Sequence, residues 1–478
     1  MHHQTLSQQL APPACNRLAS RLIALLLFLT APALASDLPA PVAAALKQAG
    51  IPERSVAVVV QGVDQSQPLL RHNALHAMNP ASTMKLVTTY AALELLGPAY
   101  TWKTEALTDA LPPNGQSTLT GNVYLRGSGD PRLALEQFWL LLRQLRARGV
   151  ATIAGDLVLD RSAFALPPHD PAAFDDEPLR PYNAGPDALL INLKSIRLTL
   201  HPDSQAISVI SETPDDELRV DNRLQLTTDA CGDWRERIKV KVDGPRIELS
   251  GSFSASCGDK ALSLSPWSAN VQVEQLFRTL WRELGGTLRG SVRDGLTPPA
   301  ARQLALAESP PLAEVVREIN KYSNNVMARQ LFLTLSGERP ASTESARRRL
   351  SAWLAGKPLQ LPGLVFDNGS GLSRSERISA DGLAQLLLAA WNSPVMPELM
   401  ASLPLAGVDG TLKKRLTNSA ATGRAHLKTG YLEEVRAIAG YAQDRHDKRW
   451  VVVCLINDPK SRLGKPAIDA LLQWVAER

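Results

Sequence analysis

The sequence lacks several features that would assign it to a common class of enzyme or binding protein. Its 478 residues include only 4 cysteines and 8 histidines, and no His-Glu-x-x-His motif occurs, so a metal site is not indicated. Its 52 basic and 47 acidic residues give a net charge of +5 without a long basic block, which argues against nucleic acid as a partner. It has no P-loop, and Gly127-Ser-Gly129 lacks the third glycine of a dinucleotide loop. These absences imply no metal, no cofactor and no nucleic-acid partner.

The composition is that of an ordinary folded protein. Hydrophobic residues make up 44% of the chain and charged residues 21%, which excludes a disordered, collagen-like or coiled-coil chain. At about 100–200 residues per domain, the length indicates about two to four domains.

Residues 1–35 have the order of a secretory signal peptide. Arg17 and Arg21 precede a short apolar run at 22–29, and Ala33-Leu-Ala35 provides a small-x-small cleavage site. The run is shorter than the roughly 20 residues that span a bilayer, although an uncleaved anchor is the alternative. No later segment is long and apolar enough for a membrane helix. We therefore expect an exported protein whose association with the membrane is at most peripheral.

Export to an oxidising compartment favours disulfide formation. Cys231 and Cys257 flank two strand-like runs between positions 237 and 253, so they predict a local disulfide that closes a hairpin. Cys454 lies within an apolar strand-like run and is expected to be a buried, unreactive thiol.

The hydrophobic pattern differs between the middle of the chain and its ends. Residues 36–100 contain two helices and two strands, and residues 301–478 end with three strands and a helix, so we expect both ends to build one sheet. Residues 101–193 and 267–300 contain short strands, proline-rich breaks and two helices, whereas residues 194–266 contain only strands. The middle is therefore predicted to be an insertion of one or two smaller domains.

Three short motifs carry candidate chemistry: Ser82-Thr-Met-Lys85, Ser323-Asn-Asn325 and Lys428-Thr-Gly430. Each of the first two patterns is expected about once by chance in a chain of this length, and the third about a tenth as often. A second Ser-x-Asn, Ser268-Ala-Asn270, has no other sign of a site around it. The order of the motifs and their structural settings must therefore carry the argument.

Ser82 begins a helical pattern, and Lys85 follows at i+3, so the two side chains share one face of the helix. A lysine buried beside a serine loses proton affinity through desolvation and can accept the serine proton. The helix N-terminus adds a positive field where an oxyanion would form. The alternative is a serine cap followed by a surface lysine.

The other two motifs can serve the same cleft. Ser323 and Asn325 lie between two helical patterns, where the serine could relay a proton to a leaving amine and the amide could hold a substrate backbone. Lys428 and Thr429 end a strand and can bind a carboxylate, while Gly430 lets a substrate backbone lie close to that strand. The alternatives are a turn with a helix cap, and a strand that runs into a loop.

In this order the three motifs match the Ser-x-x-Lys, Ser-x-Asn and Lys-Thr-Gly signature of β-lactamases and penicillin-binding proteins. With Gly127-Ser-Gly-Asp-Pro131, Tyr182-Asn-Ala-Gly185 and the string at 367–374, the mature chain resembles the class C low-molecular-mass penicillin-binding proteins, the D-alanyl-D-alanine carboxypeptidase/endopeptidase family. The resemblance implies an α/β fold: a transpeptidase/β-lactamase-like domain, with an antiparallel sheet and helices, that carries two inserted, mostly β domains.

The resemblance also implies a periplasmic serine DD-peptidase whose partners are peptidoglycan stem peptides. Ser82 would be the acyl-enzyme nucleophile and Lys85 its base, while Ser323 and Asn325 would transfer a proton and position the substrate. Lys428, with the rest of its motif, would hold the terminal D-alanine carboxylate. The same chemistry would cleave cross-links between D-alanine and diaminopimelate, and β-lactam antibiotics would acylate Ser82 as inhibitors.

Members of the family are expected to place an acidic and a basic residue near the diaminopimelate side chain. Asp160 and Arg374 are the matching candidates, with Phe164 nearby. Glu433 stands where the resemblance implies a neutral amide, and Tyr431 stands where it implies a small residue. These departures bear on substrate preference and leave the chemistry unchanged.

Two other functions remain open. A β-lactamase would use the same motifs and deacylate rapidly, although the long gap between Ser82 and Ser323 is more than a small-drug hydrolase needs. A non-catalytic wall-binding or sensor protein could keep the fold without turnover, but it would have no need of Lys85. The lifetime of a penicillin adduct on Ser82 separates these functions.

Overall fold

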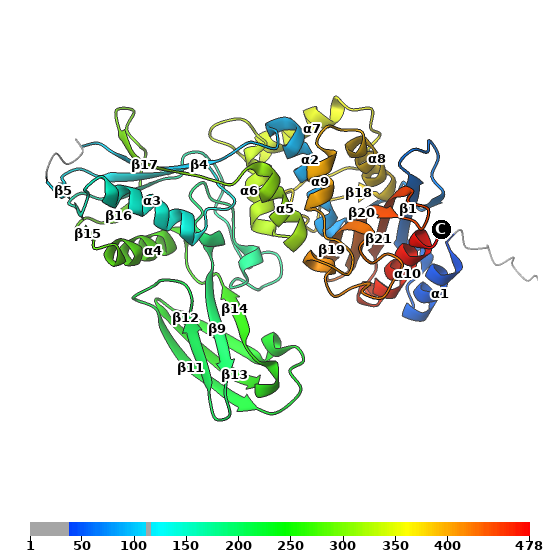
Figure 1. Cartoon of the computed structure of the whole chain (residues 1–478), viewed down its shortest axis with the longest axis horizontal. Helices are drawn as coiled ribbons and strands as arrows, with labels where there is room; N and C mark the ends of the chain where they lie inside the picture. Colours follow the sequence, from blue (N-terminus) through cyan, green and yellow to red (C-terminus); the bar gives the residue numbers. More distant parts are fainter. Residues whose placement is uncertain (1–37, 111–115) are drawn as a thin grey trace, which may run out of the picture. The chain divides into compact units, whose positions relative to one another are not determined.

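The computed structural model describes residues 38–110 and 116–478 (Figure 1). The predicted signal peptide lies outside the described residues. One five-stranded antiparallel sheet joins the two ends of the chain, and its strand order is β19 (Ala425–Leu432), β20 (Val435–Gln443), β21 (Arg449–Asn457), β1 (Val56–Gly62), β2 (Leu70–His72). The prediction that both ends build one sheet is confirmed.

Helices cover both faces of this sheet. On one face lie α1 (Ala40–Ala49) and α10 (Lys465–Ala476). Along β21, Val452 and Cys454 pack into that core, while Val451 and Val453 pack into the core on the other face. Because neighbouring side chains of a strand point to opposite faces, burial of both faces explains why this strand is continuously apolar. The Cys454 thiol is buried, and burial raises its pKa to about 12.

The core on the second face is built from helices that the sequence carries on both sides of the insertion. They are α2 (Lys85–Leu96), α5 (Leu312–Tyr322), α6 (Asn325–Thr334), α7 (Thr343–Ala355), α8 (Ala380–Trp391) and α9 (Met396–Ser402). A two-stranded ribbon, β3 (Ala77–Met78) with β18 (Ile378–Ser379), adjoins them.

The middle of the chain has sheets of its own. One has the order β16 (Val292–Asp294), β8 (Leu157–Asp160), β6 (Val123–Gly127), β4 (Lys103–Thr108), β17 (Arg302–Glu308). A smaller sheet has the order β15 (Thr287–Leu288), β7 (Thr152–Ile153), β5 (Thr118–Leu119). The two predicted helices, α3 (Leu135–Ala147) and α4 (Ala269–Glu283), share a core with these strands.

Between α3 and α4 in sequence lie two three-stranded sheets with a common core. One has the order β10 (Ile207–Ser211), β9 (Ile196–Pro202), β14 (Lys260–Leu264), and the other β11 (Arg219–Thr227), β13 (Arg246–Ser254), β12 (Ile238–Asp243). Apart from short 3₁₀ turns, this region contains only strands, as predicted. The domain boundaries after residues 100, 193, 266 and 300 stay predictions.

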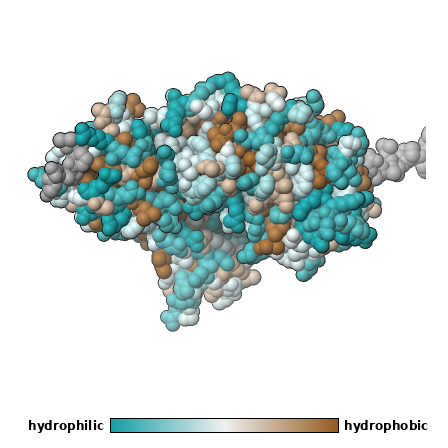
Figure 2. Space-filling model, turned by 45° about the horizontal axis from the view of Figure 1, so that its top comes forward, coloured by the Kyte–Doolittle hydropathy of each residue, from teal (hydrophilic) through white to brown (hydrophobic). Residues whose placement is uncertain are grey.

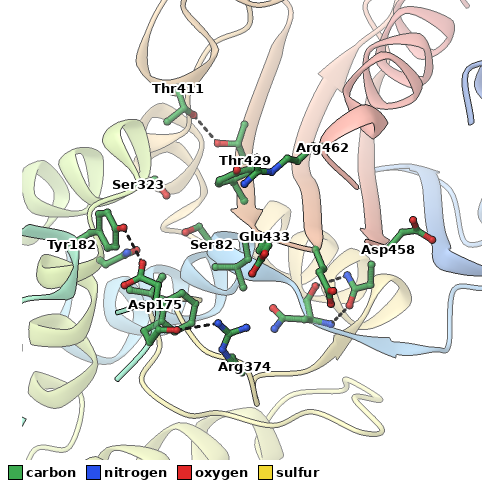
Figure 3. Close-up of a pocket in the computed structure, with 18 of the residues that line it drawn as sticks. Ser82, Asp175, Tyr182, Ser323, Arg374, Thr411, Thr429, Glu433, Asp458 and Arg462 are labelled. Atoms are coloured by element: carbon green, nitrogen blue, oxygen red, sulfur yellow. Dashed lines mark hydrogen bonds between the residues drawn. The ribbon is translucent and has the colours of Figure 1, made fainter. Parts of the chain in front are cut away.

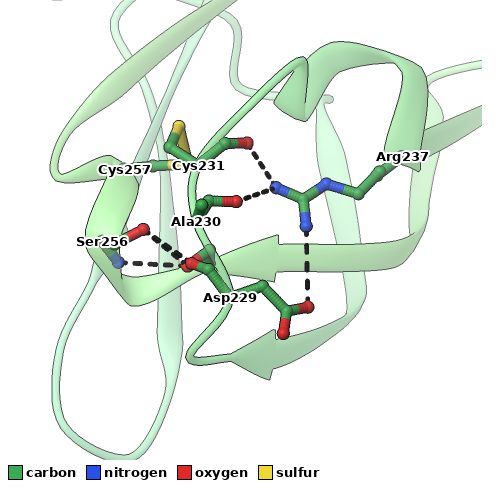
Figure 4. Close-up of a disulfide and its surroundings, with 7 residues drawn as sticks. Asp229, Ala230, Cys231, Arg237, Ser256 and Cys257 are labelled. Carbon is green, nitrogen blue, oxygen red and sulfur yellow. Dashed lines mark hydrogen bonds and ion pairs between the residues drawn. A yellow bond between two sulfur atoms is a disulfide. The ribbon is translucent and has the colours of Figure 1, made fainter.

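Cys231 and Cys257 form a disulfide beside the antiparallel pair of β12 and β13 (Figure 4). Arg237 donates hydrogen bonds to the carbonyl oxygens of Ala230 and Cys231 and lies 3.9 Å from a carboxyl oxygen of Asp229. The disulfide and the guanidinium thus hold the segment before β12 against the end of β13.

Within the two described ranges, every helix is too short or too polar to cross a bilayer. On the face drawn in Figure 2, hydrophobic residues are scattered among hydrophilic ones.

Candidate active site

Ser82 lies in a tight turn that leads into α2. Residues Ala81–Met84 form a 3₁₀ turn, and Lys85 is the first residue of the α-helix. Ser82 was expected to begin this helix, but it lies in the tighter 3₁₀ turn that precedes it. Ala81 has a φ of 46°, and its N–H donates to Asn79 Oδ1 at 2.9 Å. A non-glycine residue with positive φ is uncommon and costs free energy that surrounding contacts must supply. This turn therefore holds Ser82 in a defined place.

Lys85 connects the first two motifs. Its Nζ donates to Ser82 Oγ at 2.9 Å and to Asn325 Oδ1 at 2.7 Å, and it also donates to the carbonyl oxygen of Ser370. The Lys85 side chain is fully buried. Because α2 and α6 come from opposite sides of the insertion, only the folded chain brings this lysine and Asn325 together.

The surroundings of Lys85 favour its neutral form. Burial lowers its pKa well below the usual value, the charge of Lys428 lowers it further, and Glu376 raises it. A neutral amine has two N–H bonds, and it can donate them to Asn325 Oδ1 and to the Ser370 carbonyl oxygen, because these two oxygens can only accept. The lone pair then points toward the Ser82 hydroxyl, which is the geometry of a general base.

Ser323 is held by the third motif. It ends α5 with a φ of 57°, and its Oγ accepts a hydrogen bond from Lys428 Nζ at 2.8 Å. Lys428 also donates to the carbonyl oxygen of Thr429 at 2.8 Å and has no exposed surface. Burial lowers the pKa of Lys428 to about 7. Both lysines of the site therefore lie behind the serines rather than in the open.

The serines open into a cavity of about 870 Å³ (Figure 3). Ser82, Ser323, Asn325 and Thr429 line it, but Lys428 and Gly430 do not. Instead, a Cβ atom on Gly430 would lie 2.8 Å from the carbonyl oxygen of Pro80. This glycine is thus required for packing of β19 against the Ser82 turn. The charged and aromatic residues of the cavity are Phe174, Asp175, Tyr182, Tyr322, Arg374, Arg377, Tyr431, Glu433, Glu434, Asp458 and Arg462.

Two of the predicted substrate-binding residues, Asp160 and Phe164, do not line the Ser82 cavity. Asp160 lines a different cavity, where its carboxylate accepts hydrogen bonds from Ser162 and from the Thr297 N–H. Phe164 is not a lining residue of the Ser82 cavity either, because its ring packs against Gly129. Neither residue therefore lines the cavity of the two serines, because the end of β8 opens into the other cavity, and their part in substrate binding stays a prediction.

Asp175 and Phe174 line the Ser82 cavity, as does Arg374, whose role in binding the substrate stays a prediction. Asp175 accepts hydrogen bonds from Tyr182 Oη at 2.9 Å and Asn183 Nδ2 at 2.6 Å. Arg374 donates to the carbonyl oxygen of Phe174 at 3.0 Å, and its guanidinium lies 5.0 Å from the Phe174 ring centroid. The only sequence signal was an acidic cluster in a proline-rich stretch without periodicity.

Thr411 is a further lining residue that sequence reasoning missed. Its Oγ1 lies 2.8 Å from Thr429 Oγ1, so two hydroxyl groups face the cavity side by side (Figure 3). The neighbouring Asp409 forms an ion pair at 2.6 Å with the buried Lys321 of α5. This ion pair holds the loop that carries Thr411 near Ser323. No local sequence pattern predicts the pairing of Asp409 with Lys321.

Two serines that face one cavity, each bonded to a buried lysine behind it, form the arrangement of the serine enzymes with a Ser-x-x-Lys motif. Residues 38–478 match the model of the D-Ala-D-Ala carboxypeptidase 3 (S13) family. The chain belongs to this family and is a serine-type peptidase.

Characterised relatives cover most of the chain. It is 29% identical to the D-alanyl-D-alanine carboxypeptidase of Actinomadura sp. strain R39 over 80% of this chain and 74% of that protein. It is 26% identical to D-alanyl-D-alanine carboxypeptidase DacB of Haemophilus influenzae over 85% of this chain and 86% of that protein.

Solved structures share the fold. The crystal structure of penicillin-binding protein 4 (DacB) from Haemophilus influenzae superposes with a TM-score of 0.74 at 23% identity, covering 90% of this chain and 99% of that one. That protein has also been solved in complex with a β-lactam. The predatory endopeptidase Bd3459 of Bdellovibrio bacteriovorus superposes with a TM-score of 0.50 at 14% identity, covering 88% of this chain and 94% of that one. The predicted transpeptidase-like α/β fold is confirmed.

Proposed function

We propose that the chain is a periplasmic DD-peptidase that removes the terminal D-alanine of peptidoglycan stem peptides through an acyl-enzyme on Ser82. The observation that carries the proposal is the position of Lys85, whose Nζ lies 2.9 Å from Ser82 Oγ. Its other hydrogen bonds go to oxygens that only accept. This arrangement supports a neutral amine that takes the serine proton.

In the first step, Ser82 Oγ attacks the carbonyl carbon between the two D-alanines while its proton passes to Lys85. The N-terminal turn of α2 supplies backbone N–H groups and a positive field for the oxyanion. The amide bond then breaks, and the leaving amine takes a proton that Lys428 passes through the Ser323 hydroxyl. Water afterwards attacks the ester and returns one proton through Ser323 to Lys428, while Ser82 Oγ recovers the proton held on Lys85 and leaves the acyl carbon.

The leaving D-alanine carries a carboxylate, and Thr429 and Thr411 offer hydroxyl groups to bind it. Lys428 is buried behind Ser323, so its positive charge acts on the carboxylate from behind that serine and Thr429 rather than by direct contact. This revises the role that the sequence suggested for the lysine.

We further propose that the enzyme cleaves D-alanine–diaminopimelate cross-links. The wall formed by Asp175 and Arg374 presents one negative and one positive group, which suits the zwitterionic end of a diaminopimelate side chain. Glu433 adds a second carboxylate on the cavity.

We also propose two inserted domains. One is made of residues 101–193 and 267–300, and the other of residues 194–266; the two separate hydrophobic cores in these regions support this division. The first of them carries Asp175, which makes that insertion part of substrate selection.

The test is the intact mass of the purified protein with benzylpenicillin over time, with Ser82→Ala alongside. We expect a lasting adduct on Ser82 in the wild-type protein and none in the variant, because the amide of the β-lactam ring resembles the terminal D-Ala-D-Ala of the stem peptide. An adduct that disappears within seconds while drug is consumed would favour a β-lactamase instead. No adduct on folded protein would refute the nucleophile. Release of D-alanine from a pentapeptide, and of monomers from cross-linked muropeptide dimers, then measures the two peptidase activities separately.

A further inference from the structure

A loop behind Ser82 provides one of the three hydrogen-bond partners of Lys85. We name residues 367–371 the acceptor loop, since the carbonyl oxygen of Ser370 accepts a hydrogen bond from Lys85 Nζ. A Cβ atom on Gly371 would lie 2.0 Å from the carbonyl oxygen of Ala81. The acceptor loop therefore packs directly on the turn that carries Ser82, and a small shift of the loop would move the lysine's partner.

Glu376 holds the acceptor loop in place. Its Oε1 accepts hydrogen bonds from three consecutive backbone N–H groups, those of Asp367 at 3.3 Å, Asn368 at 3.1 Å and Gly369 at 2.9 Å. The side chain has no exposed surface, and its Oε2 has no hydrogen-bond partner among the described residues. One buried carboxyl oxygen thus ties down the first three residues of the loop.

Glu376 is also the acidic group among the charges that act on Lys85. Lys428 from β19 and Arg329 from α6 lower the pKa of Lys85, and Glu376 raises it. Burial raises the pKa of the Glu376 carboxyl, whereas the N–H donors on Oε1 favour its ionised form. Its removal would therefore alter both the geometry and the charge around the lysine.

We propose that Glu376 is a positioning residue for acylation of Ser82. By holding the acceptor loop, it keeps the Ser370 carbonyl bonded to Lys85 and so directs the lone pair of the amine at the Ser82 hydroxyl. This inference rests on the proposed function of Ser82 and Lys85.

Two variants separate the hydrogen bonds of Glu376 from its charge. Glu376→Gln keeps an oxygen at the same reach and loses the charge, whereas Glu376→Ala loses both. A matched control is Glu338→Gln, which removes an exposed carboxylate that pairs with Arg348 outside the cavity. The rate constant for benzylpenicillin adduct formation is measured by intact mass across a range of pH, with unfolding temperatures to verify folding.

We expect Glu376→Ala to acylate about 100-fold more slowly, because misplacement of a catalytic group by about 1 Å costs about that much. At the pH plateau, the rate constant for adduct formation by Glu376→Gln should stay within about threefold of the wild-type value. Its acid limb should move to lower pH, because loss of the negative charge lowers the pKa of Lys85. The control should match wild type.

A folded Glu376→Ala protein that acylates at the wild-type rate would overturn the inference. If that variant does not fold, Glu376→Leu, which also lacks the acceptor oxygen but fills the buried space, is measured instead, and a wild-type rate in it overturns the inference. A wild-type protein that forms no adduct would refute the proposed function, and the positioning role with it; normal acylation in wild type with unaffected Glu376 variants refutes only the positioning role.

Discussion

Replacing the buried Lys428 by methionine should stabilise the protein at neutral pH while it slows acylation. Burial lowers the pKa of this lysine from 10.5 to about 7. At about 1.4 kcal/mol per pKa unit, keeping this group in the folded protein costs about 5 kcal/mol at pH 7. Methionine removes that cost and also removes two hydrogen bonds, to Ser323 and Thr429, worth about 1 kcal/mol each. We expect a net gain of about 3 kcal/mol.

The stability gain of Lys428→Met over wild type should decrease as the pH rises. Because the folded pKa is below the unfolded one, the unfolded chain holds the proton between about pH 7 and about pH 10.5, and wild-type stability rises with pH in that window. The advantage of Lys428→Met over wild type should therefore be largest at or below pH 7. It should then fall by about 1.4 kcal/mol per pH unit above pH 7.

Urea unfolding followed by tryptophan fluorescence at several pH values measures this difference. Lys413→Met is a matched control, because Lys413 is exposed, and its difference from wild type should stay flat across the window. A flat difference for Lys428→Met as well would refute the depressed pKa and the buried position on which it depends. Acylation by benzylpenicillin should also slow in this variant, since Ser323 loses its donor.

Two further predictions concern the backbone and the inserted β region. Gly371→Ala should slow acylation of Ser82 by about 100-fold, because the φ of Gly371 is 79° and the new Cβ would lie 2.0 Å from the carbonyl oxygen of Ala81. The rate of penicillin adduct formation measures this effect. An unchanged rate would contradict the close packing of the acceptor loop on the Ser82 turn. Replacing Cys231 and Cys257 by serine should lower the free energy of unfolding by about 3 kcal/mol, because the disulfide closes a loop of 26 residues. Penicillin acylation of the folded variant should be unchanged, because neither cysteine lines the catalytic cavity; urea unfolding and intact mass measure the two effects.

The sequence by itself determined the elements that depend on local pattern. The pattern of apolar residues indicated the helices α1, α3 and α4, and the continuous apolar run of β21 indicated a strand that buries Cys454. The three motifs predicted Ser82, Lys85, Ser323, Asn325 and Lys428 as site residues, because the chemistry proposed for them depends on spacings of one to three residues. The spacing rules of helices and strands convert such short intervals into a shared face.

Only the tertiary structure decided which distant residues share the cavity. Asp160 ends a clear strand that opens into another cavity, while Asp175 lines the cavity of the serines from a proline-rich loop without periodicity. Likewise, Glu376 acts on Lys85 only because the acceptor loop folds back over the Ser82 turn. Long-range contacts of this kind follow from the packing of whole elements, so no local pattern encodes them. By contrast, the residue spacing within one helix turn or at one strand end is itself a local pattern, and the sequence shows it directly.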